Sequence, residues 1–534
     1  MTGRLDSGRR RDLLHRLSTE RFDVLVIGGG VTGAGAALDA AARGLRVALV
    51  EARDLASGTS SRSSKLVHGG LRYLERLDLK LVREALKERD LLVSRIAPHL
   101  VKPISFLYPS RRRMFERPYV GAGLVLYNAL EGLRRPVPYH RHLSATRARS
   151  LAPALKRDGL VGGMLYYDAQ VDDARHTLTV ARTARAHGAL IATRVSALEL
   201  RREDGAFGRV SGVRVRDEES GAEFEVAARA VVPYGAIDAD TGMILRTERS
   251  VLFIIPWGRH WIVGTTDTDT DFDGDDRAEP TATEADVDYL LAQANTALER
   301  PLTRTDVVGV YAGLRPLVAA DDASPTTRLS REHVVDVPVP GLATIAGGKP
   351  TTYRLMARDE VDAVLADYDR WVPASVTDRL PLAGAEGLAG VQAEARRLAE
   401  DHGLTVPVVE HLIERYGTLA LELFDLIDSD PGLGRPLLDG HPYLRAEAVY
   451  AVTHEGALHV EDVLARRTRL YMESSSRGAA AAREVAGLMA GPLGWDTAQA
   501  EDEAARYIAA VEAEAAALRA LDEDAVAPGP LGAA

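Results

Sequence analysis

Cysteine is absent from all 534 residues of the chain. Its absence excludes disulfide bonds, thiolate metal sites, a cysteine nucleophile and attachment of a cofactor through sulfur. Long apolar runs are lacking as well, because segments such as Val120–Leu130 are shorter than the roughly 20 residues that span a bilayer. Three adjacent arginines, Arg9–Arg11, are followed by no apolar block, so we expect no signal peptide.

Concentrated positive charge is also missing. The net charge is −11 and the sequence pI is about 5.8, and no basic stripe with interleaved aromatics offsets this. Because an acidic surface repels polyphosphate, we expect no nucleic acid partner. The ligand spacing of an EF-hand is absent too, and we expect no metal site.

Hydrophobic residues, in contrast, make up 46% of the chain. This is enough for more than one core, since single cores stop growing at roughly 250–300 residues. The pattern predicts a βαβ unit over residues 22–50, a helix over 173–188, and paired strands over 250–266. After Pro373 helices dominate, and we expect them at Val391–Ala399, Val408–Tyr416, Ala448–Leu470 and Ala498–Leu521.

A glycine-rich motif, Gly28-Gly29-Gly30-Val31-Thr32-Gly33, lies between the first predicted strand and helix. The spacing G-x-G-x-x-G lets N–H groups at the start of the helix bind a pyrophosphate without an intervening side chain. Glu51 ends the next strand, where an acid accepts a hydrogen bond from a ribose hydroxyl. An acid here argues against NADP but does not separate NAD from FAD. A turn needed only for tight helix packing is the alternative.

The segment Gly58–Tyr73 bears on that choice. Its small hydroxyl residues and paired glycines let the backbone pass close to a flat, extended ligand, as a flavin requires. A flexible serine-rich linker is the alternative, but Lys65, His68, Arg72 and Tyr73 are specific residues for a spacer. The segment therefore favours FAD.

A third cluster, Gly347–Arg354, follows an apolar strand and precedes a helix expected to begin near Leu355. Such a turn places N–H donors and the positive end of a helix against a ligand, here the electron-rich pyrimidine edge of a flavin. Lys349 would add charge there. Any α/β protein has turns of this kind, so the cluster alone decides nothing.

Two arginines and one histidine complete the residues of chemical interest. Arg315, in Tyr311–Leu317, and Arg331 can each bind a phosphate group through two hydrogen bonds, and together in one pocket they would select a phosphorylated substrate. Isolated surface arginines are the alternative. His260, in a predicted hairpin, is either a general base or an ordinary strand histidine.

These motifs occur in the order in which one family carries them. Over about Phe22–Trp495 the chain resembles bacterial FAD-dependent glycerol-3-phosphate dehydrogenases, within the D-amino-acid-oxidase-like flavoproteins. The matching segments are Ile27–Asp39 with Arg43-Gly44, Ser63–Glu75, Tyr311–Leu317, Gly347–Ala357 and Glu455–Arg467.

The resemblance implies an α/β fold: a FAD-binding Rossmann-like domain with an inserted α+β substrate domain, followed by an all-α C-terminal domain. We expect an N-terminal tail at 1–20, an oxidoreductase region at 21–375, a helical domain at 376–521 and a disordered tail at 522–534. Within the oxidoreductase region, the FAD-binding parts are expected at about 21–95, 165–235 and 342–370, and the substrate parts at about 96–164 and 236–341.

The activity that the resemblance implies is oxidation of sn-glycerol 3-phosphate to dihydroxyacetone phosphate by hydride transfer to FAD, with electrons passed to a membrane quinone. A glycerol-3-phosphate oxidase, which uses oxygen, stays open as an alternative. The family is cytoplasmic, peripheral on the inner face of the cell membrane and commonly a homodimer. Arg111–Phe115 would suit that membrane contact, unless it is a solvated basic loop.

Site residues are carried over one by one from the same resemblance. Arg72, Tyr73, Arg315, Arg331 and Lys349 match the substrate and phosphate pocket, and Arg315 and Lys349 are the expected catalytic residues. The residues that match FAD contacts are Gly28, Gly30, Gly33, Glu51, Ser60, Ser61, Lys65, His68, Gly69, Leu71, Val195 and Thr352.

One stretch departs from the family pattern. Family members have an Ala-Thr-Gly turn, a crossover and a Lys-Gly-x-His strand where Val231-Val232 here runs directly into Pro233–Asp238. A few dozen residues are therefore absent, and no residue inherits the role of the pocket histidine. Because loss of a core strand leaves hydrogen bonds unpaired and a flavin partly exposed, we expect weak FAD binding and slow or no turnover. A catalytically impaired family member is thus a further alternative.

Overall fold

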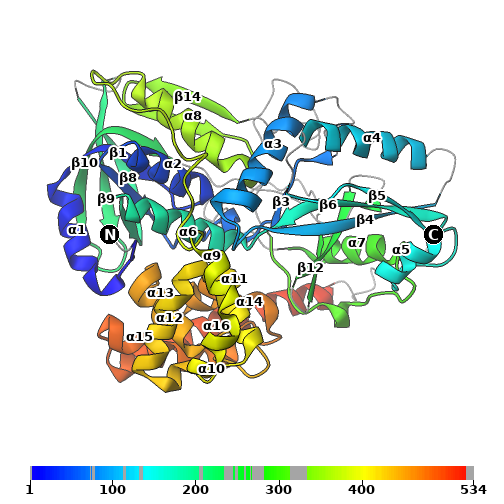
Figure 1. The fold of residues 1–534 in the computed structure, drawn as a ribbon. Coiled ribbons are helices and arrows are strands. Elements are labelled where there is room, and N and C mark those ends of the chain that lie inside the picture. The colour runs from blue at the N-terminus through cyan, green and yellow to red at the C-terminus, as the bar shows by residue number, and fades with distance from the viewer. Residues whose placement is uncertain are drawn as a thin grey trace, which may run out of the picture.

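The computed structural model arranges the chain in three adjoining parts (Figure 1). A mixed sheet with helices lies on one side, a second group of strands and helices extends from it, and a helical region packs beneath both. The structure describes residues 3–71, 74, 78–111, 116–131, 136–203, 208–233, 245–246, 251–257, 260–264, 266, 282–312 and 333–524.

The first part is built on a sheet of eight strands among the described residues. Its main order is β14-β15-β10-β1-β2-β7, and β8 and β9 continue from β10 as antiparallel strands. Strands β15, β10, β1, β2 and β7 run parallel, as expected for a Rossmann-like unit. The bounds are β1 Arg21–Ile27, β2 Val47–Glu51, β7 Leu190–Thr193, β8 Val195–Arg202, β9 Val210–Asp217, β10 Glu223–Pro233, β14 Val334–Val339 and β15 Leu342–Ala346.

Helices α2 (Val31–Ala42), α6 (Asp173–Ala186) and α8 (Tyr353–Leu365) pack against one another beside this sheet. Alanine and glycine let α2 approach closely: a Cβ on Gly35 would lie 2.9 Å from a ring carbon of Tyr353. Residues 1–20, expected as a tail, contain helix α1 (Arg10–Thr19), whose Leu17 is fully buried against the sheet.

The second part has two antiparallel sheets. One comprises β3 (Leu66–Val67), β4, β5 and β6, and the other β11, β12 and β13. Phe253 of β12 shares a hydrophobic core with Phe106 and Tyr166 of the first sheet. The remaining bounds are β4 Lys102–Ser110, β5 Arg141–Ser144, β6 Gly162–Gln170, β11 Leu245–Arg246, β12 Val251–Trp257, β13 His260–Gly264, α3 Leu79–Leu91, α4 Glu116–Glu131, α5 Ala145–Leu151 and α7 Glu284–Asn295.

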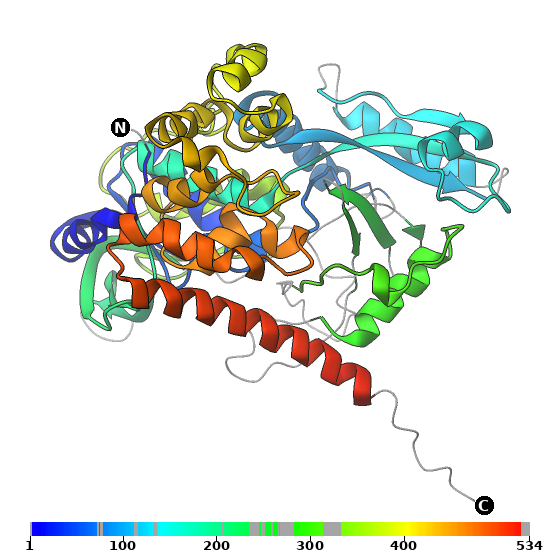
Figure 2. The same ribbon diagram turned by 90° about the horizontal axis from the view of Figure 1, so that it is seen from below.

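The C-terminal part is helical in every regular element described, and α16 runs along its lower face (Figure 2). The long helix expected over Ala448–Leu470 is wrong, because Gly456 adopts a left-handed conformation that ends α13 and a π-helix, Asp462–Arg467, follows. The helices are α9 Leu388–Ala393, α10 Ala395–Asp401, α11 Val406–Tyr416, α12 Ala420–Ser429, α13 Arg445–Glu455, α14 Leu470–Glu473, α15 Ala482–Leu493 and α16 Thr497–Asp524.

No helix within the described ranges combines the length and the apolar character needed to cross a bilayer.

Candidate functional site

The glycine turn joins β1 to α2 at the edge where the parallel strands end. Glu51, at the end of the neighbouring β2, accepts hydrogen bonds from Gly29 N at 2.6 Å and from Arg53 N at 2.8 Å. Burial raises the pKa of the Glu51 carboxyl, and these two amide bonds act against that rise. The acid and the glycine turn predicted from sequence are therefore in direct contact.

The start of α2 is lined by backbone rather than by bulky side chains. Gly30 precedes the helix, and the first-turn amides of an α-helix, which include that of Gly33, have no partner within the helix. Ser60 reaches this corner, where its Oγ accepts the N–H of Val31 at 3.0 Å. A Cβ on Gly30 would lie 3.3 Å from that hydroxyl. The corner thus offers amide and hydroxyl groups to an anion, as a pyrophosphate requires.

The loop Ser60–Gly69 leads away from this corner, and we call it the flavin loop after the ligand that its sequence favours. Lys65 lies within it at a φ of 61° and is fully buried. Its Nζ donates to Ser61 O at 2.8 Å and to Asp173 Oδ1 at 2.7 Å. The Lys65 ammonium therefore anchors the loop to the start of α6.

Beyond Lys65, the flavin loop meets the third predicted cluster. His68 N donates to Thr351 Oγ1 at 3.2 Å, although 283 residues separate the two in sequence. Ser64 Oγ, between these points, is buried and has no hydrogen-bond partner among the described residues. A buried hydroxyl of this kind is available to a ligand that the loop surrounds.

The end of the loop is held by residues that sequence reasoning missed. Gly69 N donates to Tyr127 OH at 2.9 Å, and Tyr127 OH donates to Asp168 at 2.8 Å. Arg89 Nη1 also donates to Asp168, at 2.8 Å. A Cβ on Gly69 would lie 2.4 Å from Leu86. Only the alternation of β6, which turns Asp168 inward, hints at this network in the sequence.

The third cluster forms a tight turn before α8. Gly347 and Gly348 have φ of 78° and 93°, and a Cβ on Gly348 would lie 2.4 Å from Met356 Sδ. Lys349 is 3% exposed, and its carbonyl accepts hydrogen bonds from Thr352 N and Oγ1. The turn places the buried Lys349 next to the Thr351 contact with the flavin loop.

The other predicted site residues fall into two groups. Val195 is fully buried in the core beside the sheet, and Leu71 is partly buried against α3 and β3. His260 is partly buried in β13, opposite Trp257. The predicted substrate-binding residues Arg72, Tyr73, Arg315 and Arg331 lie outside the described residues.

Comparison with known proteins supplies the family. Residues 23–240 match the family model "FAD dependent oxidoreductase", and residues 375–500 match "C-terminal domain of alpha-glycerophosphate oxidase". Glycerol-3-phosphate dehydrogenase 2 of Mycobacterium tuberculosis is 50% identical over 531 residues, covering 93% of this chain and 89% of that protein. The mitochondrial glycerol-3-phosphate dehydrogenase of Bos taurus is 36% identical over 545 residues, covering 93% and 74%.

The chain belongs to the FAD-dependent glycerol-3-phosphate dehydrogenases. An X-ray structure of the glycerol-3-phosphate dehydrogenase from Bacillus halodurans, complexed with FAD, superimposes with a TM-score of 0.75 at 27% identity, over 96% of this chain and 97% of that one. The predicted family and the α/β fold with an all-α C-terminal domain are thereby confirmed.

The described residues of this family member fit the family's cofactor. The amides at the start of α2, the Glu51 carboxylate and the buried Ser64 hydroxyl suit a diphosphate, a ribose and a further polar group, respectively. The flavin loop connects these groups to the Lys349 turn.

Proposed function

We propose that the chain oxidises sn-glycerol 3-phosphate to dihydroxyacetone phosphate with FAD as the hydride acceptor. The observation that carries the proposal is the contact between His68 N and Thr351 Oγ1, because it joins the dinucleotide corner to the Lys349 turn through one continuous loop. The relatives' names, glycerol-3-phosphate dehydrogenase at 50% and 36% identity, supply the substrate.

Each group in the site then has a role. The amides at the start of α2 bind the FAD diphosphate and Glu51 binds its ribose. FAD, when bound, would supply a flavin able to accept a hydride from the substrate carbon, while the hydroxyl proton passes to a base or to water. Lys349 and Arg315 stabilise negative charge on the substrate oxygen, and Arg72, Tyr73 and Arg331 complete the pocket for the phosphate. The remaining proposed FAD contacts are Gly28, Gly30, Gly33, Ser60, Ser61, Lys65, His68, Gly69, Leu71, Val195 and Thr352.

The test is anaerobic mixing of the FAD-loaded chain with glycerol 3-phosphate and, separately, with glycerol. We expect the phosphate ester alone to bleach the oxidised flavin band, because only it engages the arginines. Equal bleaching by glycerol contradicts the phosphate assignments, and no bleaching by either contradicts the activity.

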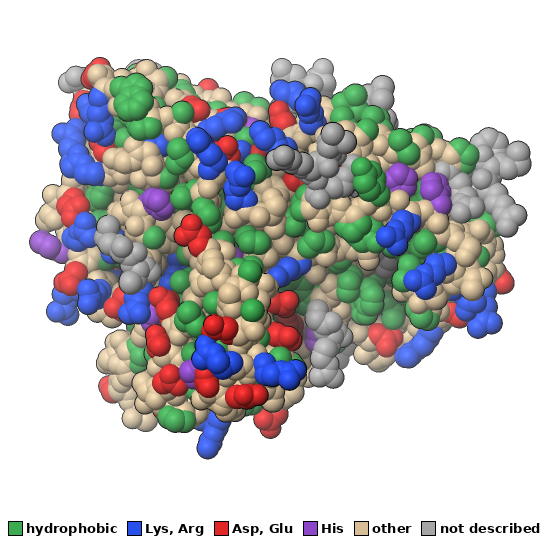
Figure 3. All heavy atoms as spheres, in the orientation of Figure 1, with side chains coloured by type: hydrophobic (Ala, Val, Ile, Leu, Met, Phe, Trp, Pro, Cys, Tyr) green, Lys and Arg blue, Asp and Glu red, His purple; other side chains and the backbone are tan. Residues whose placement is uncertain are grey.

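The electron acceptor is part of the same proposal, and we assign it to a membrane quinone. Support comes from α4, where Tyr119 and Val125 are 59% and 57% exposed close to Arg111 in sequence. Hydrophobic side chains are visible over the region of α4 (Figure 3). Apolar side chains near arginine suit peripheral binding to the anionic inner face of the cell membrane. Co-sedimentation with anionic vesicles tests the membrane contact, and reduction of a soluble quinone tests the electron acceptor. Stoichiometric formation of peroxide would favour the oxidase instead. The resemblance also implies a homodimer, and light scattering, which measures the mass of the purified protein in solution, tests it.

We also propose that the enzyme is weakened, because the sequence after β10 lacks a segment that the family pattern has there. The alignment to the Mycobacterium tuberculosis relative spans 531 residues but uses 93% of this chain, which agrees with a few dozen unmatched positions. Among the described strands, β11-β12-β13 and the sheet containing β6 share a core but no ladder, as loss of an intervening strand would leave them. We expect the purified chain to carry substoichiometric FAD and to turn over slowly. Full flavin occupancy with turnover equal to that of a relative would contradict this.

A further inference from the structure

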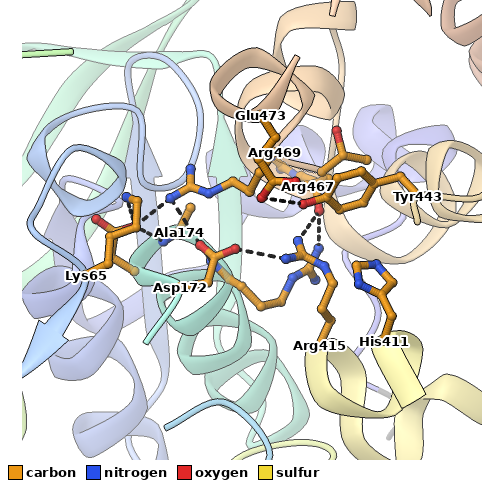
Figure 4. Close-up of polar contacts among 12 residues, drawn as sticks. Lys65, Asp172, Ala174, His411, Arg415, Tyr443, Arg467, Arg469 and Glu473 are labelled. Atoms are coloured by element: carbon orange, nitrogen blue, oxygen red, sulfur yellow. Dashed lines mark hydrogen bonds and ion pairs between the residues drawn. The ribbon is translucent and has the colours of Figure 1, made fainter. Parts of the chain in front are cut away.

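The flavin loop and the C-terminal helical part meet at two adjacent carboxylates, Asp172 and Asp173, at the start of α6. Lys65 approaches them from the flavin loop, and Arg415 and Arg469 approach from the C-terminal helical part. Figure 4 shows Arg469 extending toward Lys65, while Arg415 reaches Asp172 from another direction. We call these five residues the aspartate junction.

Asp173 is the acceptor that organises the flavin loop. Its Oδ2 accepts the N–H of Ser63 at 2.9 Å, and its Oδ1 accepts Lys65 Nζ at 2.7 Å. The same Oδ1 accepts Arg469 Nη2 at 2.6 Å. One carboxylate therefore holds the loop through two contacts and the C-terminal part through a third.

Arg469 also contacts the loop directly. Its Nη2 donates to Ser61 O at 3.4 Å, and Lys65 Nζ donates to that same carbonyl at 2.8 Å. Ser61 follows Ser60, the residue whose hydroxyl bonds to Val31 at the start of α2. Arg469 is thus one residue removed from the dinucleotide corner, although 408 residues separate it from Ser61 in sequence.

Because the side chains of the aspartate junction are buried, the junction is sensitive to the loss of any of its charges or hydrogen bonds. The side chains of Lys65 and Arg469 are 0% and 1% exposed, and those of Asp173 and Asp172 are 6% and 11% exposed. Burial, together with the nearby Arg469, lowers the pKa of Lys65 to about 8, while Asp173 acts in the opposite direction. Removing Arg469 takes a charged hydrogen-bond donor away from two buried acceptors, Asp173 Oδ1 and Ser61 O, and leaves them under-satisfied.

We propose that Arg469 is a positioning residue for the flavin loop, so that the C-terminal helical part holds the cofactor-binding backbone in place through Ser61 O and Asp173. The assignment of FAD as the ligand of the flavin loop rests on the proposed function. The positioning itself is a property of the chain without ligand.

Arg415 provides a matched control. It is also a buried arginine of the C-terminal part, and its Nη1 pairs with Asp172 Oδ2 at 3.0 Å. Its second hydrogen bond goes to Arg467 O rather than to the flavin loop. Arg469→Gln and Arg415→Gln therefore remove the same kind of charge from the same junction, but only the first removes a contact to the loop.

The experiment compares amide hydrogen exchange in the wild type, Arg469→Gln and Arg415→Gln, all freed of FAD. We expect Arg469→Gln to speed exchange across residues 60–69 about 10- to 100-fold, the range for loss of a charge-assisted hydrogen bond. Arg415→Gln should leave these amides near their wild-type rates, and Arg469→Lys, which keeps the charge, should restore part of the protection. The FAD dissociation constant, measured by fluorescence quenching, should rise in the same order.

Equal exchange of residues 60–69 in Arg469→Gln and Arg415→Gln would overturn the proposal. If the glutamine variants fail to fold by circular dichroism, Arg469→Lys and Arg415→Lys are compared instead, and we expect faster exchange of residues 60–69 only in Arg469→Lys, by a smaller factor. If glycerol 3-phosphate does not bleach the flavin band of the FAD-loaded wild type, the proposed function is contradicted instead. The hydrogen-exchange comparison without FAD would still decide the role of Arg469.

Discussion

His459 lies in the C-terminal part between two carboxylates from different elements. Its Nε2 is 3.0 Å from Glu219 and its Nδ1 is 2.9 Å from Glu503. Burial of the imidazole lowers its pKa, but the hydrogen bonds to Glu219 and Glu503 outweigh this and raise the pKa to about 10. The protonated ring therefore joins the turn after β9 to α16.

This histidine predicts a pH dependence of stability. The pKa of His459 in the folded chain lies above its unfolded value of about 6.5. The contribution of His459 to the free energy of unfolding is therefore full below pH 6.5 and is lost as the pH rises through about 10. Because Glu219 is partly exposed, we expect a total on the order of 1 kcal/mol. Thermal melts of the wild type and His459→Gln should differ most near pH 6 and converge above pH 10. A constant difference over that range would refute the assignment.

Gly69 lies where the space that a Cβ atom would occupy is already filled by neighbouring side chains. Adding a methyl group would place it 2.4 Å from Leu86 and 2.5 Å from Tyr127 OH. We expect Gly69→Ala to destabilise the fold by about 1–3 kcal/mol through overpacking, and to weaken FAD binding because the flavin loop must shift. Gly487→Ala, in α15 with nothing within 4 Å, is the control. Urea titration of both variants measures the effect, and equal stabilities would contradict the packing argument.

At the scale of elements, the turn that carries Lys349 depends on how α8 is held. Arg354, in the first turns of α8, pairs through Nε and Nη2 with both oxygens of Glu88 on α3, at 2.7 and 2.6 Å. Both side chains are at most 6% exposed. The pair fixes α8 against the helix that follows the flavin loop.

We expect Glu88→Gln to cost about 3–5 kcal/mol, because it leaves the Arg354 guanidinium buried without a counter-charge. The double variant Glu88→Met with Arg354→Met should recover much of this loss, since it removes both charges together. Glu84→Gln, one turn earlier on α3, is the control and should change stability by less than about 0.5 kcal/mol. Denaturant melts of these variants measure the free energies of unfolding. A double variant less stable than Glu88→Gln would argue against the pairing.

For the whole molecule, the contact between the oxidoreductase region and the C-terminal part is ionic as well as apolar. Asp54, just beyond β2, accepts Arg466 Nε at 2.5 Å and Arg467 Nη2 at 2.8 Å. Asp54 and Arg467 are at most 1% exposed, and Arg466 is 5% exposed. One carboxylate therefore contacts two guanidinium groups from the opposite side, of which Arg466 also pairs with Glu461 and Asp462.

Asp54→Asn should weaken this contact. We expect a loss of about 3–5 kcal/mol, with earlier exposure of the C-terminal part to protease, because the buried Arg467 loses its carboxylate partner and Arg466 keeps only Glu461 and Asp462. The exposed Asp425→Asn on α12 should have little effect. Limited proteolysis followed by mass spectrometry locates the first cleavage, and identical patterns for the two variants would contradict the expectation.

The sequence by itself determined the βαβ unit with its glycine turn, the place of Glu51 at the end of the second strand, and the helical C-terminal region, because these follow from local periodicity and short spacing. The tertiary structure alone decided the partners of the flavin loop: Asp168, Asp173, Thr351 and Arg469 reach it from distant segments, and no local pattern encodes which buried charges meet. The break at Gly456 was missed because helical periodicity continues on both sides of this glycine, which ends α13 in a left-handed conformation and lies close to Leu5.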